Sequence, residues 1–302
     1  MRFLAIGECM VEMSHASAGL WRQGFAGDTL NTAWYMRGLL PNDWQVDYFT
    51  VVGNDPLSEA MLRFMADAKI GTSLIARHPD RVPGLYMISL DAGERSFTYW
   101  RDRSAARTLA EDAGRLERIL AGADIIYVSG ITMAVLEGDG REILLDQLAR
   151  SRAAGQRIVF DPNLRPRLWN NPAAMCAVIE ATAALADIVL PSHDDEARHF
   201  GDVSPEATAR RYAALGPSEV MVKNGGGPMA LSVAGEAPMI LPALGIVTPV
   251  DTTGAGDSFN AGYLAARLNG AFAPEAVRRG HELASRVVQH YGALLPVEQP
   301  GG

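Results

Sequence analysis

Short apolar runs rich in valine and isoleucine recur along the chain, with helix-length segments between them. This alternation is the pattern of parallel βαβ units. Most runs are apolar on both faces, as expected for strands that helices cover on each side. The expected strands are residues 3–7, 46–53, 124–130, 157–163, 187–192 and 219–225, and the expected helices are residues 28–40, 56–68, 141–154, 172–185 and 205–215. The sequence therefore predicts an α/β fold with a doubly wound, mainly parallel sheet and helices on both faces.

Two regions interrupt this alternation and have the character of antiparallel β structure. They are residues 11–27 and residues 84–103, and the second contains a hairpin that turns at residues 91–94. A small sheet inserted after the first strand of a doubly wound domain is placed to act as a lid. The sequence has no repeats and no linker rich in proline or serine. We therefore expect one domain over residues 1–302, with this lid.

Composition excludes several classes of function. The 302 residues carry a formal net charge of -8 and no long run of like charges, so no nucleic-acid partner is expected. The two cysteines, Cys9 and Cys176, form no CxxC pair, which argues against a disulfide framework or a zinc site. No apolar run approaches the ~20 residues that span a bilayer, and no cleavage site follows the apolar start. These features favour a cytoplasmic protein with no membrane partner.

The stretch DTTGAGDSFNAGY (residues 251–263) places glycines and an aspartate at the start of a helix. Apolar residues follow Asp257 at helical spacing, so Gly254, Ala255 and Gly256 form the entrance to that helix. Free N–H groups and the helix dipole make such an entrance an anion cradle. Asp257 could merely cap the helix, which is the commoner role of this pattern. Capping does not explain the flanking DTT, so we favour a base that accepts the proton of an alcohol attacking a phosphoryl group.

The same stretch resembles the C-terminal signature of the ribokinase-like (PfkB) carbohydrate kinases, and AGDTLNTAWYMRGL (residues 26–39) resembles their N-terminal sugar-binding signature. The resemblance extends to GECMVEM near the start and RGHELASRVVQHYGA near the end, so it covers nearly the whole chain. It implies a doubly wound domain with a β lid, ATP as phosphoryl donor, Mg²⁺ as cofactor and a sugar hydroxyl as acceptor. Some relatives also need a monovalent cation, and the sequence leaves that requirement open.

Within this family the chain most resembles the 2-keto-3-deoxygluconate kinases, through AGDTLNTAWY, PGLYMI, GERSFTYWRDRSAA and DPNLRPRLW. The implied substrate is an acid sugar that is phosphorylated at its C6 hydroxyl. A carboxylate at one end of a substrate calls for guanidinium groups. The resemblance assigns this pocket to Gly27, Tyr86, Tyr99, Arg101 and Arg165, with Asp28 and Asn31 holding hydroxyls and Arg167 as a weaker candidate.

Other interpretations of these residues remain open. Tyrosines on β segments are more often packing residues than ligand contacts, and arginines after a turn are more often solvated. A kinase for fructose, ribose or a nucleoside would keep the same base with a neutral acceptor. A sugar-binding regulator would need no base at all. The sequence also does not separate the gluco from the galacto epimer of the acid sugar.

A third set of residues is implied on the nucleotide side. The family's Asn-x-x-Glu pattern, which organises magnesium through water, corresponds here to residues 192–195 (SHDD), followed by Glu196. Asp195 is one methylene shorter than glutamate, so Asp195 is the candidate with Glu196 in reserve, and a charged first turn of a helix is the alternative. The implied nucleotide-binding residues are Ser192, Lys223, Gly225, Gly254 and Gly256, with adenine against residues 223–227 and 281–285. The absence of GxxxxGK[ST] excludes a P-loop protein.

The expected partners are small molecules, namely an acid sugar and ATP. Lid sheets of this kind expose strand edges that can pair. We therefore expect a homodimer or a higher homo-oligomer.

Overall fold

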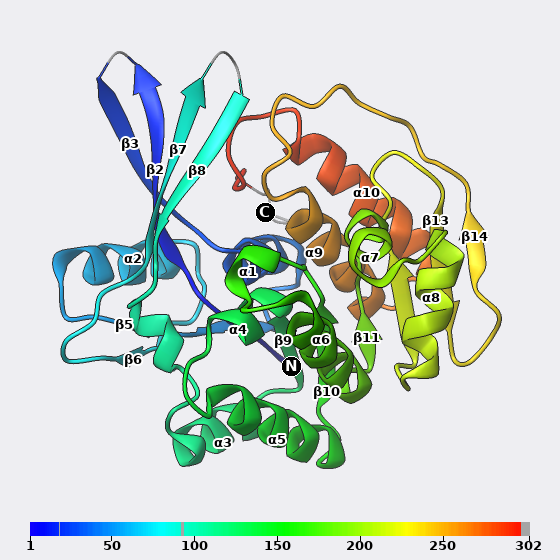
Figure 1. Cartoon of the computed structure of the whole chain (residues 1–302), viewed down its shortest axis with the longest axis horizontal. Coiled ribbons are helices and arrows are strands. Elements are labelled where there is room, and N and C mark those ends of the chain that lie inside the picture. Colours follow the sequence, from blue (N-terminus) through cyan, green and yellow to red (C-terminus); the bar gives the residue numbers. More distant parts are fainter. Residues whose placement is uncertain (18, 92–93, 297–302) are drawn as a thin grey trace.

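The structure is a computed structural model of the chain and describes residues 1–17, 19–91 and 94–296. Among these described residues, eight strands form a central sheet (Figure 1). Six neighbouring strands run parallel, and two antiparallel strands extend one edge. In spatial order they are β14 (Met239–Leu241), β13 (Met229–Val233), β12 (Glu219–Val222), β11 (Ile188–Val189), β10 (Arg157–Asp161), β9 (Ile125–Ser129), β1 (Arg2–Ile6) and β4 (Gln45–Phe49). This mainly parallel sheet confirms the predicted fold class.

Helices cover both faces of the sheet, and the strand residues alternate between two cores. In β1, Phe3 and Ala5 pack into one core, while Leu4 and Ile6 pack into the other. This explains why the strand is apolar from Phe3 to Ile6, on both of its faces. The helices on the first face are α1 (Asp28–Leu39), α2 (Pro56–Asp67), α9 (Ala255–Leu268) and α10 (Ala273–Val287). Those on the second are α3 (Ala113–Ala121), α4 (Gly130–Val135), α5 (Gly140–Ala153), α6 (Pro172–Leu185), α7 (His193–Phe200) and α8 (Pro205–Ala214), with short 3-10 turns η1 (Ala105–Thr108) and η2 (Pro166–Leu168).

Three helices begin where the sequence predicts because their start signals are local. Helices α2, α6 and α8 each have proline as their first residue. The preceding residue accepts a backbone N–H through its side chain, and these caps are Asp55, Asn171 and Ser204. Proline fixes a helical φ without losing a needed donor, and the cap satisfies an N–H that has no partner within the helix.

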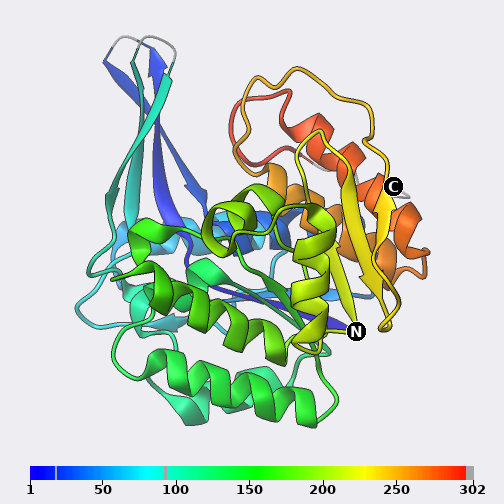
Figure 2. The same cartoon turned by 45° about the vertical axis from the view of Figure 1, so that its right-hand side comes forward.

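A second sheet stands away from the main one, as Figures 1 and 2 show. Its spatial order is β3-β2-β7-β8. The strands are β2 (Met10–Ser17), β3 (Leu20–Ala26), β7 (Leu85–Asp91) and β8 (Glu94–Trp100). The two hairpins are antiparallel, and β2 joins β7 in parallel. We call this sheet the lid. The predicted turn at residues 91–94 falls partly on residues 92–93, which lie outside the described residues.

One predicted strand is wrong. The run 46–53 divides into β4 and β5 (Val51–Val52), and β5 pairs with β6 (Ala76–Arg77) in a separate two-stranded sheet. The cause lies in the neighbouring strand, because β1 ends at Ile6 and Gly7 donates to the carbonyl of Phe49. Beyond Phe49 the main sheet offers this run no partner there, so the chain turns toward Ala76, whose N–H binds the carbonyl of Thr50.

The predicted strand at residues 187–192 is also longer than the observed one, since β11 contains two residues. Across the described chain, no helix has both the length and the apolar character needed to cross a membrane.

Candidate active site

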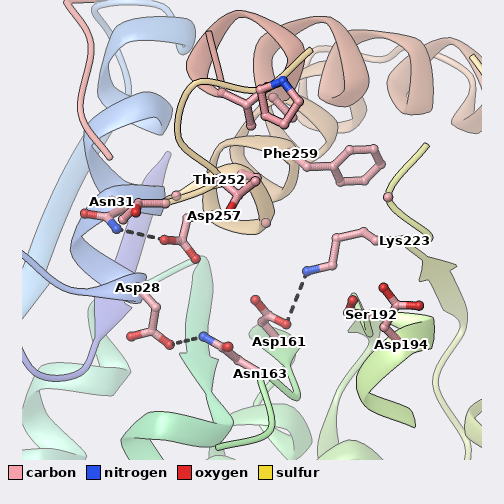
Figure 3. Close-up of a pocket in the computed structure, with 18 of the residues that line it drawn as sticks. Asp28, Asn31, Asp161, Asn163, Ser192, Asp194, Lys223, Thr252, Asp257 and Phe259 are labelled. Atoms are coloured by element: carbon pink, nitrogen blue, oxygen red, sulfur yellow. Dashed lines mark hydrogen bonds and ion pairs between the residues drawn. The ribbon is translucent and has the colours of Figure 1, made fainter. Parts of the chain in front are cut away.

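A cavity of about 840 Å³ lies where the carboxyl ends of the central strands meet the starts of α1, α7 and α9. The lid closes one side of it and α10 borders the other. Ligands of open α/β sheets bind at this edge of the sheet. Figure 3 shows part of the lining, with carboxylates and amides from several elements pointing into one space. The lining residues from the sequence prediction are Gly27, Asp28, Asn31, Tyr86, Tyr99, Arg165, Ser192, Asp195, Lys223, Gly225, Gly254, Ala255, Gly256 and Asp257.

The start of α1 supplies the polar groups at one end of this cavity. Gly27 precedes the helix, and a Cβ there would lie 2.1 Å from the carbonyl oxygen of Glu8, so the close approach requires glycine. Asp28 accepts a hydrogen bond from Asn163 Nδ2 at 2.7 Å (Figure 3). Asn31 donates to Asp257 Oδ2, also at 2.7 Å. These contacts join α1 to the segment after β10 and to α9, and they bring predicted residues from both signatures together.

Asp257 lies in the first turn of α9, partly buried, and lines the cavity. Burial and, after it, the nearby Asp28 carboxylate together raise the pKa of Asp257 to about 7, against the hydrogen bond from Asn31. Burial likewise raises the pKa of Asp28. A carboxylate with a pKa near neutrality can both accept and release a proton at physiological pH. The position and the pKa of Asp257 suit a general base.

The turn before α9, Gly254–Ala255–Gly256, has the geometry of an anion cradle, and we call it the glycine turn. Gly254 precedes the helix with φ +76°, and a Cβ there would lie 2.9 Å from Ala293 Cβ. Both facts require glycine. The first N–H groups of a helix have no partner within the helix, and the helix dipole adds positive potential. The turn can therefore hold a phosphate beside Asp257.

The lid contributes aromatic side chains to the cavity. Tyr86 and Tyr99 are directly opposite each other on β7 and β8, with ring centroids 5.8 Å apart. Phe97 stacks beside Tyr99 at 6.3 Å and lines the same wall. The Tyr86 hydroxyl donates to Glu12, which lies beside it on β2. Both predicted tyrosines thus line the cavity, Tyr99 half exposed and Tyr86 buried in a small core with Met10, Ala26 and Ile88.

The two predicted arginines have different surroundings. Arg165 lines the cavity with its side chain 51% exposed, and its Nη1 lies 3.5 Å from Asp195 Oδ2. Arg101 is 7% exposed and pairs with the Glu8 carboxylate, outside the residues that line the cavity. Glu8 supplies the counter-charge that a buried cation needs, and the Arg101 guanidinium carbon lies 5.9 Å from the ring centroid of Tyr99, which lines the cavity. The role of Arg101 in binding the acid sugar stays a prediction. Arg167 does not line the cavity either.

The other end of the cavity is formed by the loops after β11 and β12 and by α10. Ser192 precedes α7 and bridges to Lys223, and Asp194, Asp195, Gly225 and Gly226 follow along the wall. Further from the strand ends the lining becomes more apolar. Gly226 packs closely against Ile246 there, since a Cβ on Gly226 would lie 3.1 Å from the Ile246 side chain. The residues of this apolar end are Gly245, Ile246, Val247, Pro249, His281, Ala284, Ser285 and Val288. They include the region of residues 281–285 expected to contact adenine.

Glu196 does not face the cavity. It is fully buried, and its carboxylate accepts hydrogen bonds from Arg211 at 2.7 Å and from the Tyr212 hydroxyl at 3.0 Å. Burial raises its pKa to about 7, against the attraction of Arg211. The alternative in which Glu196 organises a metal is therefore wrong, because this carboxylate anchors α7 to α8.

Comparison with known proteins decides the family. The sequence profile described as pfkB family carbohydrate kinase matches residues 2–300. The chain belongs to the pfkB family of carbohydrate kinases. Relatives of this pfkB kinase include the 2-dehydro-3-deoxygluconokinase of Dickeya dadantii (strain 3937), which is 42% identical over 299 residues, covering 97% of this chain and 96% of the relative. The protein of the same name from Escherichia coli (strain K12) is 41% identical over 303 residues, covering 98% of each.

Solved structures agree with this fold. The PfkB protein from Polaromonas sp. JS666 superimposes with a TM-score of 0.83 and 28% identity, covering 95% of each chain. A putative Ribokinase II in complex with ATP and Mg²⁺ from Escherichia coli has a TM-score of 0.82 and 22% identity, covering 97% of this chain and 94% of that chain. At that identity the second comparison supports the fold of the pfkB kinase alone.

The structure adds residues to the site of this pfkB kinase that the sequence reasoning missed. Asp161 ends β10, Asn163 follows that strand, and both line the cavity, with Asn260 behind them on α9. Asn163 has φ +35°, a conformation that is rare outside glycine and common at functional sites. Their position at the end of a parallel strand was the available signal, since strand ends define this edge of the sheet.

Proposed function

We propose that this kinase transfers the γ-phosphoryl group of ATP to the C6 hydroxyl of 2-keto-3-deoxy-D-gluconate, which is also called 2-dehydro-3-deoxygluconate. One observation carries the proposal: the partly buried carboxylate of Asp257 lies between the polar end of the cavity and the glycine turn. The relatives at 41–42% identity bear the corresponding name.

The proposed reaction is the transfer of one phosphoryl group from ATP to the acceptor hydroxyl. The acceptor oxygen forms a bond to the γ-phosphorus as the bond from that phosphorus to the β,γ-bridging oxygen of ATP breaks, and ADP leaves with the electron pair. Asp257 takes the hydroxyl proton, and the N–H groups of the glycine turn bind the charge on the transferred phosphoryl group. Asn31 orients Asp257 by its hydrogen bond.

Magnesium fits the nucleotide end of the cavity. Among the described residues, no group of three or more His, Cys, Asp or Glu side chains could hold a metal ion. Mg²⁺ in kinases keeps several waters and uses one or two carboxylates together with the phosphates of the substrate. Asp194 and Asp195 line the cavity and supply such carboxylates. When bound, the ion would offset the negative charge of the phosphates. Whether the enzyme also needs a monovalent cation can be tested by titrating K⁺ salts into an assay of kinase activity.

The acceptor end is assigned to Asp28, Asn31, Tyr86, Tyr99 and Arg165. We propose that Arg165 pairs with the substrate carboxylate and that Asp28 and Asn31 bind hydroxyls. The fork of a guanidinium suits a carboxylate, and Arg165 is half exposed and so free to reorient. The lid would then cover the sugar with its tyrosines and exclude water, which limits hydrolysis of ATP.

The substitution Arg165→Ala tests this assignment, and Arg167→Ala two residues away is the control. If the acceptor is an acid sugar, Arg165→Ala should raise the KM for that sugar by about tenfold or more. A tenfold rise corresponds to a loss of roughly 1.4 kcal/mol of binding free energy. The KM for ATP and the activity of Arg167→Ala should change little. An unchanged KM for the acid sugar in Arg165→Ala would favour the alternative of a neutral acceptor such as fructose or ribose.

The lid has two edge strands, β3 and β8. We propose that the kinase forms a homodimer through these edges, and light scattering after size exclusion should then give twice the 32.4 kDa chain mass. Because ATP is the donor, we place the protein in the cytoplasm.

A further inference from the structure

A buried ammonium group lies beside the glycine turn. Lys223 directly follows β12 and is 9% exposed, yet it lines the cavity. Among the described lining residues, Arg165 is the other arginine or lysine, and its half-exposed side chain lies beside Asp195. Lys223 is therefore the buried cation of this site.

Two side chains hold the ammonium in place, and Figure 3 shows one of them, Asp161. Lys223 Nζ lies 2.9 Å from Asn260 Oδ1 and 3.3 Å from Asp161 Oδ1. Asn260 in turn donates to Asp161 Oδ2 at 2.7 Å and to the Tyr127 hydroxyl at 3.0 Å. Asp161, Asn260 and Tyr127 are each at most 3% exposed. The ammonium is thus fixed by a buried network that comes from β9, β10 and α9.

The held ammonium faces the place where a phosphate would bind. A Cβ built on Gly256 would lie 3.7 Å from Lys223 Nζ, and Gly256 directly precedes Asp257 in α9. The two hydrogen bonds use two of the three ammonium protons. The third can bind an oxygen of a phosphoryl group that rests on the glycine turn.

The choice of lysine is unusual for this chain. The sequence has 27 lysines and arginines, and Lys69 and Lys223 are the two lysines among them. A compact ammonium fits between Asp161 and the glycine turn, whereas a planar guanidinium needs more room. An ammonium on a flexible stem can also follow an oxygen that moves during transfer.

We infer that Lys223 is a catalytic residue that contacts the γ-phosphoryl group during its transfer, and that Asp161 and Asn260 are the positioning residues that hold its ammonium toward the glycine turn. In the free protein the ammonium is neutralised by Asp161. When ATP is bound, the phosphoryl oxygens take the remaining donor, and charge that develops on the transferred group meets a fixed cation. The inference rests on the proposed kinase function.

Steady-state kinetics test the inference through the separation of kcat from KM. Lys223→Met should lower kcat by about 100-fold or more, because a preorganised donor to the transferred group is lost, while the KM of the acid sugar stays within roughly threefold. Asp161→Asn should lower kcat by a smaller factor with the same unchanged KM. Lys69→Met, at an exposed position, is the control and should leave both constants unchanged. A kcat of Lys223→Met within threefold of the unsubstituted protein would overturn the inference.

A measurement on the unsubstituted protein avoids any effect of substitution on folding. In the NMR spectrum of protein labelled with ¹⁵N-lysine, the two lysines give two side-chain signals. The signal that disappears in Lys69→Arg belongs to Lys69, and the other belongs to Lys223. Addition of a non-hydrolysable ATP analogue with Mg²⁺ should shift the Lys223 signal and leave the Lys69 signal in place. If calorimetry shows that the analogue binds and the Lys223 signal does not move, the inference is wrong.

The experiments distinguish a failure of the proposed function from a failure of the proposed role of Lys223. If the unsubstituted protein phosphorylates no sugar of the panel described below, the proposed function fails. If it phosphorylates the acid sugar while Lys223→Met keeps its kcat, the role of Lys223 alone fails.

Discussion

At the scale of single residues, the site concentrates carboxylates around a partly buried cavity. Asp28, Asp161 and Asp257 lie around one space, with Lys223 as the buried cation. Such an arrangement raises the pKa of Asp257 and prepares it for proton transfer. The same arrangement works against folding, because a buried carboxylate is more costly when ionised.

The pKa of Asp257 predicts the pH dependence of catalysis. A general base must be deprotonated to act, and the pKa of Asp257 is raised to about 7. The value of kcat/KM for the acid sugar should therefore fall as the pH drops below about 7, approaching a tenfold loss per pH unit. Initial rates at saturating ATP from pH 5 to 9 measure this limb, with ATP binding followed by calorimetry as the control. A flat profile down to pH 5 would contradict the assignment of Asp257 as the base.

The substitution Asp257→Asn should abolish turnover and stabilise the fold above neutral pH. Because the folded pKa exceeds the unfolded value, the ionised carboxylate destabilises the folded protein, and this loss develops as pH rises from about 4 to about 7. The amide keeps the hydrogen bond from Asn31 and removes the charge. We expect a gain of about 0.5–2 kcal/mol in the free energy of unfolding at pH 8. Urea unfolding at pH 8 and pH 5.5 measures it, and an equal gain at both pH values would count against the buried charge as its cause.

Sequence reasoning located the residues whose roles depend on local pattern. Asp257 and the glycine turn were identified from a helix start, and Asp28 and Asn31 from a signature in α1. Asp161, Asn163 and Asn260 were missed because their roles arise from contacts between distant segments. Glu196 was misjudged for the same reason, since its partners Arg211 and Tyr212 lie on the next helix. The pairing of Arg101 with Glu8, 93 positions earlier, is likewise a contact that the local pattern does not predict.

At the scale of elements, the glycine turn provides a matched pair of substitutions. Gly254→Ala places a Cβ at φ +76° and 2.9 Å from Ala293, so it should cost about 1–3 kcal/mol of unfolding free energy. Gly256→Ala meets its nearest neighbour at 3.7 Å, an ordinary contact, and alanine favours a helix. Thermal unfolding should show a clear loss in Tm for Gly254→Ala and little change for Gly256→Ala. Equal losses would show that the backbone conformation of Gly254 is not what requires glycine.

Element boundaries were predictable where a local signal fixes them. The cap and proline at the starts of α2, α6 and α8 determine those helices without tertiary contacts. Strand lengths follow a different rule, because a strand extends only as far as its neighbour. The run 46–53 is mostly apolar, and yet it divides after Phe49, where β1 ends. No property of the run itself carries that information.

At the scale of the whole molecule, the fold brings two sequence signatures more than 200 residues apart into one hydrogen bond, from Asn31 to Asp257. The alternation of strands and helices predicted the sheet and its two covered faces. It did not predict the antiparallel edge formed by β13 and β14, which depends on pairing rather than on periodicity. The cavity follows from the sheet, since its residues come from strand ends and from the lid.

The measurement that tests the central claim most directly is release of ADP in a coupled assay with Mg-ATP and a panel of acceptors. The panel holds 2-keto-3-deoxygluconate, its galacto epimer, fructose, ribose and adenosine. We predict that kcat/KM for 2-keto-3-deoxygluconate exceeds that for each neutral acceptor by about 100-fold or more, which is roughly 2.7 kcal/mol of transition-state stabilisation. A higher kcat/KM for fructose, ribose or adenosine would contradict the proposed substrate and the role of Arg165.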